Sequence, residues 1–212
     1  MAINLQNTNA VRVSGIKLLV YGQAGAGKTS LIPTMPNPII LSAEAGLLSI
    51  AGADLPFVEI DGMNTLREAY TWLKDSDEAK QFDSVALDSI SEMGEVCLTQ
   101  EKATAKDPRQ AYGEIQAMMH VLFTAKLDKS SDEMGRLMYA PSMPGNKTGQ
   151  ALPYFFDIVA ALRVEKDAEG VVQRGLMCQS DGLWQAKDRS GKLDAWEAPD
   201  IGAIIEKIGG AK

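Results

Sequence analysis

The 212-residue sequence is poor in the features that mark membrane, secreted and metal-binding proteins. No apolar run approaches the roughly 18 residues that a transmembrane helix needs, and the first ten residues lack the basic and apolar blocks of a signal peptide. The two cysteines, Cys97 and Cys178, give no disulfide framework, and the single histidine, His120, cannot build a histidine-based metal site alone. We therefore expect a cytoplasmic protein that makes no membrane contact.

The chain also has fewer positive than negative side chains. The chain has 21 Lys and Arg against 28 Asp and Glu, a formal net charge of −7. A protein that coats nucleic acid by bulk electrostatics carries the opposite sign. Any contact with nucleic acid would have to be local, through a basic loop or groove.

A phosphate-binding motif dominates what is present. The apolar run from Ile16 to Val20 predicts a strand buried on both faces, and Gly22-x4-Gly27-Lys28-Thr29 follows it and opens a predicted helix. This strand, glycine loop and helix are the context in which a P-loop motif is meaningful. The glycines let backbone N–H groups point at phosphate oxygens, Lys28 can reach the β- and γ-phosphates, and the Thr29 hydroxyl can ligate Mg²⁺.

Two further apolar segments end in a carboxylate. Ile39–Leu41 leads into Glu44, and Val85–Leu87 leads into Asp88. Ligands bind at the carboxyl ends of parallel strands. Asp88 is therefore a candidate second-carboxylate support for Mg²⁺, and Glu44 is either a general base that polarises the attacking water or an ordinary acidic residue at a helix start.

The remaining pattern alternates strands with helices. Leu66, Ala69, Tyr70 and Leu73 have helical spacing, whereas Val121–Ala125 predicts a core strand that ends at Lys126. Lys126 is either a γ-phosphate sensor or a solvated lysine. This alternation predicts an α/β fold with a mostly parallel sheet flanked by helices, built from residues 16–212 after a lead-in at 1–15.

The C-terminal third carries two more predicted features. Residues 128–153 are polar and rich in Pro and Gly, which is typical of a functional or mobile loop. Its cations and aromatics make it a candidate single-stranded DNA surface, and the residues concerned are Lys129, Arg136, Tyr139 and Lys147. Val171–Cys178 and Leu183–Ala186 predict a β-hairpin within 165–191, and Ile201–Ile208 an amphipathic closing helix.

Four segments resemble, in order, the core of RecA-like ATPases. They are the P-loop at 22–29, the strand at 39–46 that resembles the one ending in the catalytic glutamate of RecA, the strand at 85–89 ending in Asp-Ser, and Lys187-Asp188-Arg189-Ser190-Gly191, which resembles the Lys-x-Arg-x-Gly element of RadA- and DnaB-type ATPases. The length, the MPG segment and the YFFD segment are similar to phage RecA-like recombinases, the single-strand annealing proteins of the Sak type.

The resemblance implies an ATPase with ATP and Mg²⁺ as cofactors. Glu44 would activate water, Thr29 and Asp88 would hold the metal, and Lys187 and Arg189 would reach the γ-phosphate of the neighbouring subunit in a ring or filament. The implied nucleotide-binding residues are Gly22, Gln23, Ala24, Gly25, Ala26, Gly27, Lys28, Thr29 and Ser30.

The implied function is ATP-dependent binding of single-stranded DNA that promotes annealing or strand exchange in phage recombination, in the cytoplasm of a bacterial host. A phage single-strand-binding protein would be a further partner. The alternative is a RecA-fold ATPase that acts as a motor or regulatory module on a protein partner, which the acidic net charge favours.

Overall fold

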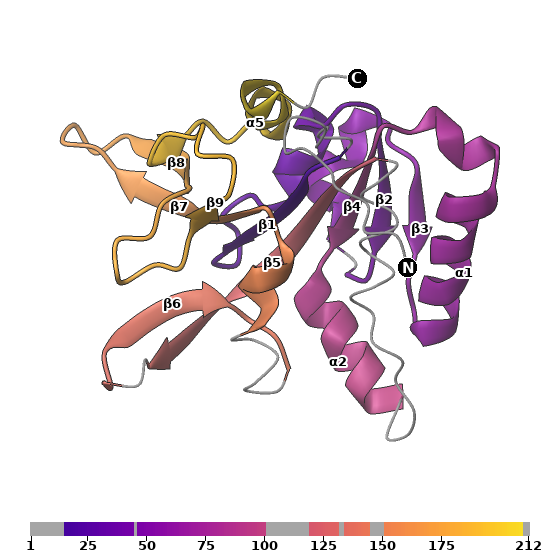
Figure 1. Ribbon diagram of the computed structural model, residues 1–212, viewed down its shortest axis with the longest axis horizontal. Helices are drawn as coiled ribbons and strands as arrows, with labels where there is room; N and C mark the ends of the chain where they lie inside the picture. The colour runs from indigo at the N-terminus through magenta and orange to yellow at the C-terminus, as the bar shows by residue number, and fades with distance from the viewer. Residues whose placement is uncertain (1–14, 45, 101–118, 132–133, 145–150, 210–212) are drawn as a thin grey trace, which may run out of the picture.

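Parallel strands form the centre of the structure (Figure 1). The computed structural model describes residues 15–44, 46–100, 119–131, 134–144 and 151–209. Across the sheet the parallel strands are β7 (Ile158–Lys166), β1 (Lys17–Gly22), β5 (His120–Ser131), β4 (Ser84–Asp88), β2 (Pro38–Ser42) and β3 (Phe57–Glu59). Antiparallel strands extend it, namely β6 (Leu137–Pro141), β8 (Val172–Met177), β9 (Lys187–Asp188) and β10 (Trp196–Glu197).

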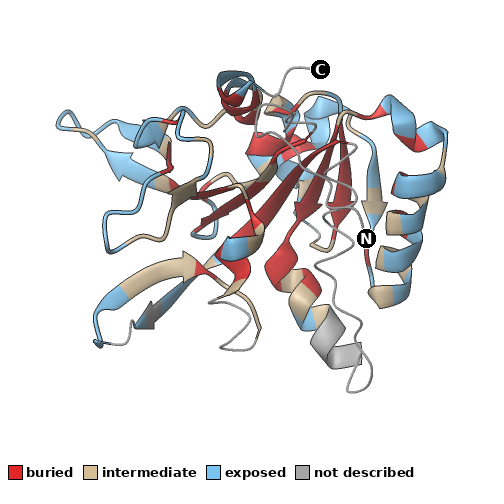
Figure 2. Cartoon of the chain, in the orientation of Figure 1, coloured by how far each residue is buried: buried red, intermediate tan, exposed pale blue. Residues whose placement is uncertain are grey.

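Alternate residues of the central strands face opposite sides of the sheet, because side chains of a strand alternate with a period of two. Leu19 and Tyr21 of β1 belong to the core on one face, with residues of α1 (Met63–Asp75) and α2 (Ile90–Gln100). Leu18 and Val20 belong to the core on the other face, with the 3-10 helix η2 (Thr29–Thr34) and α5 (Ile201–Ile208). Figure 2 shows the buried residues concentrated on these central strands. The predicted α/β class with a mostly parallel sheet is confirmed.

The helices follow the sequence pattern. The stripe that contains Ala69 and Leu73 is buried in α1, and Ile201, Ile204, Ile205 and Ile208 are all buried in α5. The Asp200 side chain accepts a hydrogen bond from the Ala203 N–H at 3.0 Å and caps α5. Short 3-10 turns complete the described chain, namely η3 (Leu47–Ala53), η4 (Glu78–Gln81) and η5 (Leu152–Phe155).

The helix expected after the P-loop is only a six-residue 3-10 turn, η2. Pro33 lies inside it and has no N–H to donate, and Met35, which precedes Pro36, is extended with ψ 151°. The prolines expected to end the helix therefore prevent more than one or two turns from forming.

The prediction that residues 128–153 are a loop is wrong for most of the described part. β5 does not end at Lys126 but continues to Ser131, where it pairs with β6 in an antiparallel hairpin, and η5 follows later. The polar residues Asp128 to Ser131 lack an apolar alternation because this half of the strand lies outside the core. Residues 145–150 and the first 14 residues of the predicted lead-in at 1–15 lie outside the described residues.

The predicted pairing of Val171–Cys178 with Leu183–Ala186 is also wrong. β8 pairs with β7 on one side and β10 on the other. The Ser180–Gly182 turn does form, with the Asp181 carboxylate accepting the N–H groups of Leu183 and Trp184 at 2.8 and 2.7 Å. The chain then leads Trp184 to a bridge with Tyr139 of β6 instead of back along β8.

Candidate nucleotide-binding site

The loop between β1 and η2 has the backbone of a phosphate cradle. Gly25 and Gly27 have φ values of +75° and +99°, a region that side-chain-bearing residues rarely adopt. Gly22 serves a different need, because a Cβ there would lie 2.7 Å from the Leu162 carbonyl oxygen of β7. The motif therefore needs glycine for two reasons, a positive φ at Gly25 and Gly27 and a close approach of the backbone at Gly22.

A cavity of about 850 Å³ opens beside this loop. Of the nine nucleotide-binding residues expected from the sequence, Gln23, Ala24, Gly25, Gly27, Lys28, Thr29 and Ser30 line it, as do Glu44, Asp88 and Lys126. Gly22 and Ala26 are buried behind the lining residues. The fold therefore gathers the P-loop and both predicted carboxylates around one space, which is large enough for a nucleotide.

Lys28 lies at the loop with its ammonium 3.0 Å from the carbonyl oxygens of both Gly22 and Gln23. Burial lowers the pKa of Lys28, and the nearby carboxylates of Asp88 and Glu44 oppose that shift. The amine is therefore a partly desolvated donor facing two acids, a position from which it can bind phosphate oxygens.

Thr29 and Asp88 form the part of the site that fits Mg²⁺. The Thr29 hydroxyl donates to Asp88 Oδ2 at 2.8 Å, and the Thr124 hydroxyl of β5 donates to Asp88 Oδ1. Asp88 is only 2% exposed and has both oxygens held in place. One hydroxyl and one carboxylate are the donor set that a Mg²⁺ shared with nucleotide phosphates requires, and within the described ranges no group of three or more His, Cys, Asp and Glu offers a protein-only metal site.

Glu44 reaches the cavity from the end of β2, and two serines hold it. Ser89 donates to Glu44 Oε1 at 2.6 Å, while Ser42 donates to the Glu44 carbonyl oxygen at 2.7 Å. Ser89 directly follows Asp88, so the Asp-Ser pair at the end of β4 supplies one carboxylate of the site and the hydroxyl that holds the other. The sequence indicated the two acids but not the role of Ser89 and Thr124 in orienting them.

Lys126 lines the cavity from the middle of β5, not from a strand end. Its ammonium pairs with Glu92 of α2, and this hydrogen bond raises the pKa of Lys126. Lys126 therefore lies at the nucleotide cavity, as a γ-phosphate sensor would, but its charge is paired with Glu92.

Lys187 and Arg189 do not line the cavity of their own chain. The Lys187 ammonium donates to the Pro153 carbonyl at 2.7 Å, and Arg189 donates to the Tyr154 carbonyl at 3.0 Å and lies 3.6 Å from Asp157. β9 pairs with the start of β7, the end away from the P-loop. Their predicted action on a neighbouring subunit stays a prediction.

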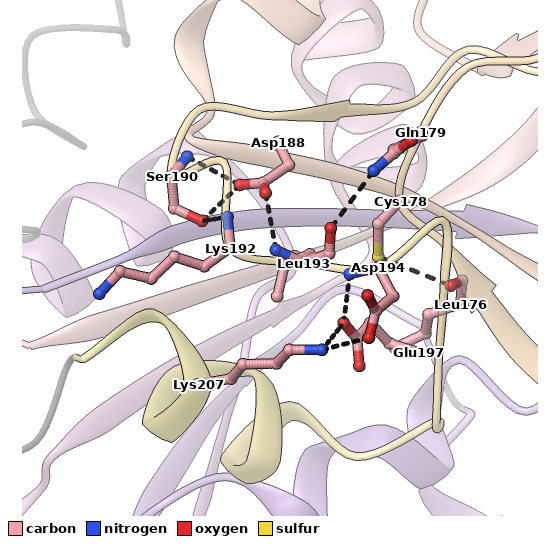
Figure 3. Close-up of polar contacts among 10 residues, drawn as sticks. All are labelled: Leu176, Cys178, Gln179, Asp188, Ser190, Lys192, Leu193, Asp194, Glu197 and Lys207. Atoms are coloured by element: carbon pink, nitrogen blue, oxygen red, sulfur yellow. Dashed lines mark hydrogen bonds and ion pairs between the residues drawn. The ribbon is translucent and has the colours of Figure 1, made fainter.

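The turn that carries Arg189 is built around Asp188 (Figure 3). One oxygen of the Asp188 carboxylate accepts the Ser190 N–H and hydroxyl at 2.7 and 2.6 Å, and the other accepts the Leu193 N–H at 3.0 Å. Lys207 of α5 secures the following stretch through Asp194 and Glu197 at 2.7 and 2.6 Å. The segment is therefore a fixed structure and not a free tail.

The candidate DNA residues lie on the β5–β6 hairpin. Lys129 is on β5, Tyr139 is on β6, and Arg136 is in the connection between them. Lys129 Nζ lies 5.7 Å from the centre of the Tyr139 ring. Lys147 lies outside the described residues.

One cavity residue has no local sequence signal. Arg174 of β8 lines the cavity, and its Nε donates to the Ala26 carbonyl of the P-loop at 3.2 Å. Only the pairing of β8 with β7, whose Leu162 backs the P-loop, brings it there.

Comparisons with known proteins assign the chain to a family. A family model described as an AAA domain matches residues 14–190. Similar solved structures include the flagellar accessory protein FlaH from Methanocaldococcus jannaschii, which is 10% identical with 77% of each chain covered and a TM-score of 0.49. A KaiC-like protein from Pyrococcus horikoshii OT3 is 14% identical, with 77% of this chain and 78% of that chain covered and a TM-score of 0.47. No curated protein matches the sequence.

The family match and the geometry of the site agree. The matched residues contain the P-loop and both carboxylates that line the cavity, and the match supports an ATPase function on a P-loop fold. In the part of the chain that the structure describes, no helix is long and apolar enough to cross a membrane. The chain belongs to the AAA domain family.

Proposed function

We propose that the protein is a RecA-like ATPase that binds single-stranded DNA in an ATP-dependent manner and promotes annealing or strand exchange in phage recombination. The observation that carries the proposal is the β5–β6 hairpin, which runs from the nucleotide cavity to the candidate DNA residues. Lys126 and Leu127 of β5 line the cavity, and Lys129 follows two residues later on the same strand.

The hairpin is attached to the nucleotide site at a second point. The Tyr21 hydroxyl, on the residue before Gly22, lies 3.0 Å from the Tyr139 carbonyl of β6 and 2.8 Å from the Gln185 carbonyl. The Tyr139 ring also stacks on Trp184, with the ring centres 4.4 Å apart. These contacts connect the strand that leads into the P-loop with β6, and we propose this connection as the route that couples ATP to DNA binding.

The charge of the hairpin suits a local contact. Lys129 and Arg136 are exposed and can bind phosphates, whereas Asp128 on the same strand limits the positive charge. Tyr139 is half-buried and already stacked on Trp184, so we assign the main DNA contact to the two cations and only a secondary role to this ring. With a net charge of −7 on the chain, binding would be confined to this surface.

We propose that Lys187 and Arg189 act on the nucleotide of the neighbouring subunit in a ring or filament. There they would stabilise charge on the γ-phosphate. Arg189 is exposed, and the Asp188 turn fixes the backbone that presents it. Hydrolysis would then depend on assembly, with Glu44 polarising the attacking water and Lys28, Thr29 and Asp88 holding the phosphates and Mg²⁺.

Binding of a labelled oligo(dT) at several salt concentrations, with and without ATP, tests the DNA assignment. For single strands the logarithm of affinity falls with the logarithm of salt by about 0.7 for each phosphate contact. Lys129→Ala with Arg136→Ala should reduce that slope, while Lys80→Ala, an exposed lysine on η4 whose partner is the exposed Asp77, should not. Absence of salt-dependent binding would favour the alternative, an ATPase module that acts on a protein partner.

Mixing two inactive variants tests the action in trans. Arg189→Ala keeps its own P-loop, and Lys28→Ala keeps its own Arg189, so a mixed assembly contains interfaces with both parts intact. We expect ATPase activity in the mixture well above the sum of the separate variants. A strictly additive mixture would contradict the trans assignment.

A further inference from the structure

Arg174 occupies the nucleotide cavity without a role in the proposed mechanism. It lies on β8 opposite Val164, two residues beyond Leu162, the β7 residue whose carbonyl oxygen packs against Gly22. The β7–β8 hairpin therefore extends past the end of β1 and carries Arg174 over the glycine loop. A Cβ built on Gly27 would lie 3.6 Å from Arg174 Nε, which shows how closely the side chain crosses the loop.

The contacts of Arg174 leave most of its hydrogen-bonding capacity available for a ligand. Nε uses one N–H on the Ala26 carbonyl, whereas a guanidinium carries five in a planar fork that matches phosphate oxygens. Among the described residues, no carboxylate forms an ion pair with Arg174. Lys126, by contrast, shares the cavity but is paired with Glu92.

The charge of the cavity also calls for another cation. A nucleoside triphosphate would bring several negative charges beside Glu44 and Asp88, both of which line the same space. Lys28 faces these two acids, which oppose the lowering of its pKa by burial. A further, always charged group beside the glycine loop would reduce the repulsion between phosphates and carboxylates.

We propose that Arg174 contacts the polyphosphate of the bound nucleotide in the same chain that supplies the P-loop. This inference rests on the proposed ATP binding but not on assembly or on DNA. The protein would then use two arginines in different ways: Arg174 sets nucleotide affinity within one subunit, and Arg189 acts across subunits on hydrolysis.

The test is a titration with a fluorescent ATP analogue, followed by its displacement with unlabelled ATP or inorganic tripolyphosphate. Hydrogen bonds to charged groups typically contribute enough for about a ten- to 150-fold change in affinity. We expect Arg174→Ala and Arg174→Gln to lower the affinity for both ATP and tripolyphosphate by about that factor at all protein concentrations. Arg174→Lys should keep part of the affinity because it keeps the charge.

Lys166→Ala is the matched control, since it removes an exposed cation from the same hairpin outside the cavity. Its affinity for ATP and tripolyphosphate should equal that of the unaltered protein. Thermal unfolding without nucleotide identifies any variant that fails to fold, and Arg174→Gln, which keeps a donor for the Ala26 carbonyl, separates charge from this hydrogen bond.

Three results would overturn the inference. Full affinity in Arg174→Gln would reduce the side chain to a support for the loop. A loss for ATP with unchanged binding of tripolyphosphate would place the contact on the nucleoside. Failure of the unaltered protein to bind ATP or tripolyphosphate would overturn the proposed function itself, and the role of Arg174 with it.

Discussion

Replacing Thr124 by Val tests the buried contact that orients the second carboxylate of the site. Thr124 is fully buried, and its hydroxyl donates to Asp88 Oδ1, while Asp88 is 2% exposed. Valine keeps the shape and removes the donor, so one buried carboxylate oxygen loses this partner. Such a loss costs about 1–3 kcal/mol in the free energy of unfolding.

For a chain of this size each kcal/mol lowers the melting temperature by about 2–4 °C, so we expect a decrease of about 2–12 °C. Urea unfolding followed by circular dichroism measures the free energy directly. We also expect hydrolysis by Thr124→Val to need more Mg²⁺ for half-maximal rate, because among the described residues Thr29 is then the remaining side-chain donor to the Asp88 carboxylate.

Thr71→Val is the control, since it makes the same chemical change on the exposed surface of α1, where the hydroxyl bonds the Arg67 carbonyl at 2.9 Å. Surface substitutions of this kind change stability by no more than about 0.5 kcal/mol. If Thr124→Val were equally mild and its Mg²⁺ dependence unchanged, the conclusion that Thr124 holds Asp88 for the metal would be refuted.

Three other predictions concern the loop and the core. Lys28→Ala should abolish ATP binding or turnover in calorimetry and phosphate-release assays, and undiminished ATPase activity would contradict the P-loop assignment. Gly22→Ala should lower stability by about 1–3 kcal/mol and weaken ATP binding, because its Cβ would meet the Leu162 carbonyl oxygen at 2.7 Å; a melting temperature equal to that of the unaltered protein would show that the strands separate easily. Burial raises the pKa of the Cys178 thiol from 9.0 to about 12. Because the unfolded chain loses this proton at lower pH than the folded protein, the contribution of Cys178 to the free energy of unfolding should fall as pH rises from about 9 towards 12. In a Cys97→Ser background, a thiol reagent should label Cys178 only when the protein unfolds, and rapid labelling of the native protein would contradict its burial.

The parts of the fold that the sequence predicted are those whose signal is local. The β1 strand and P-loop follow from a contiguous motif, and α1 follows from apolar spacing that includes Ala69 and Leu73. β2 and β4 follow from short apolar runs, and β2 ends two residues before Glu44 while β4 ends at Asp88. In each case the residues that decide the structure are neighbours in the chain.

The parts that the sequence could not supply depend on distant partners. The turn at Asp181 was recognisable, but nothing in it specifies that Trp184 meets Tyr139 instead of β8. The second half of β5 is polar, and only its pairing with β6 makes it a strand. Arg174 is 148 residues from Ala26 in the sequence and reaches the P-loop through the pairing of β8 with β7.

The two halves of β5 differ in how firmly they are held, and this predicts where the molecule opens. From Val121 to Phe123 the strand has neighbours on both sides, β1 and β4, whereas from Leu127 onwards its pairing partner among the described strands is β6 alone. Amide hydrogens of the first half should exchange only on global unfolding, and those of the second half through a smaller local opening. The boundary falls at Lys126, so the two strands of the hairpin can separate and reclose without unfolding of the central parallel sheet.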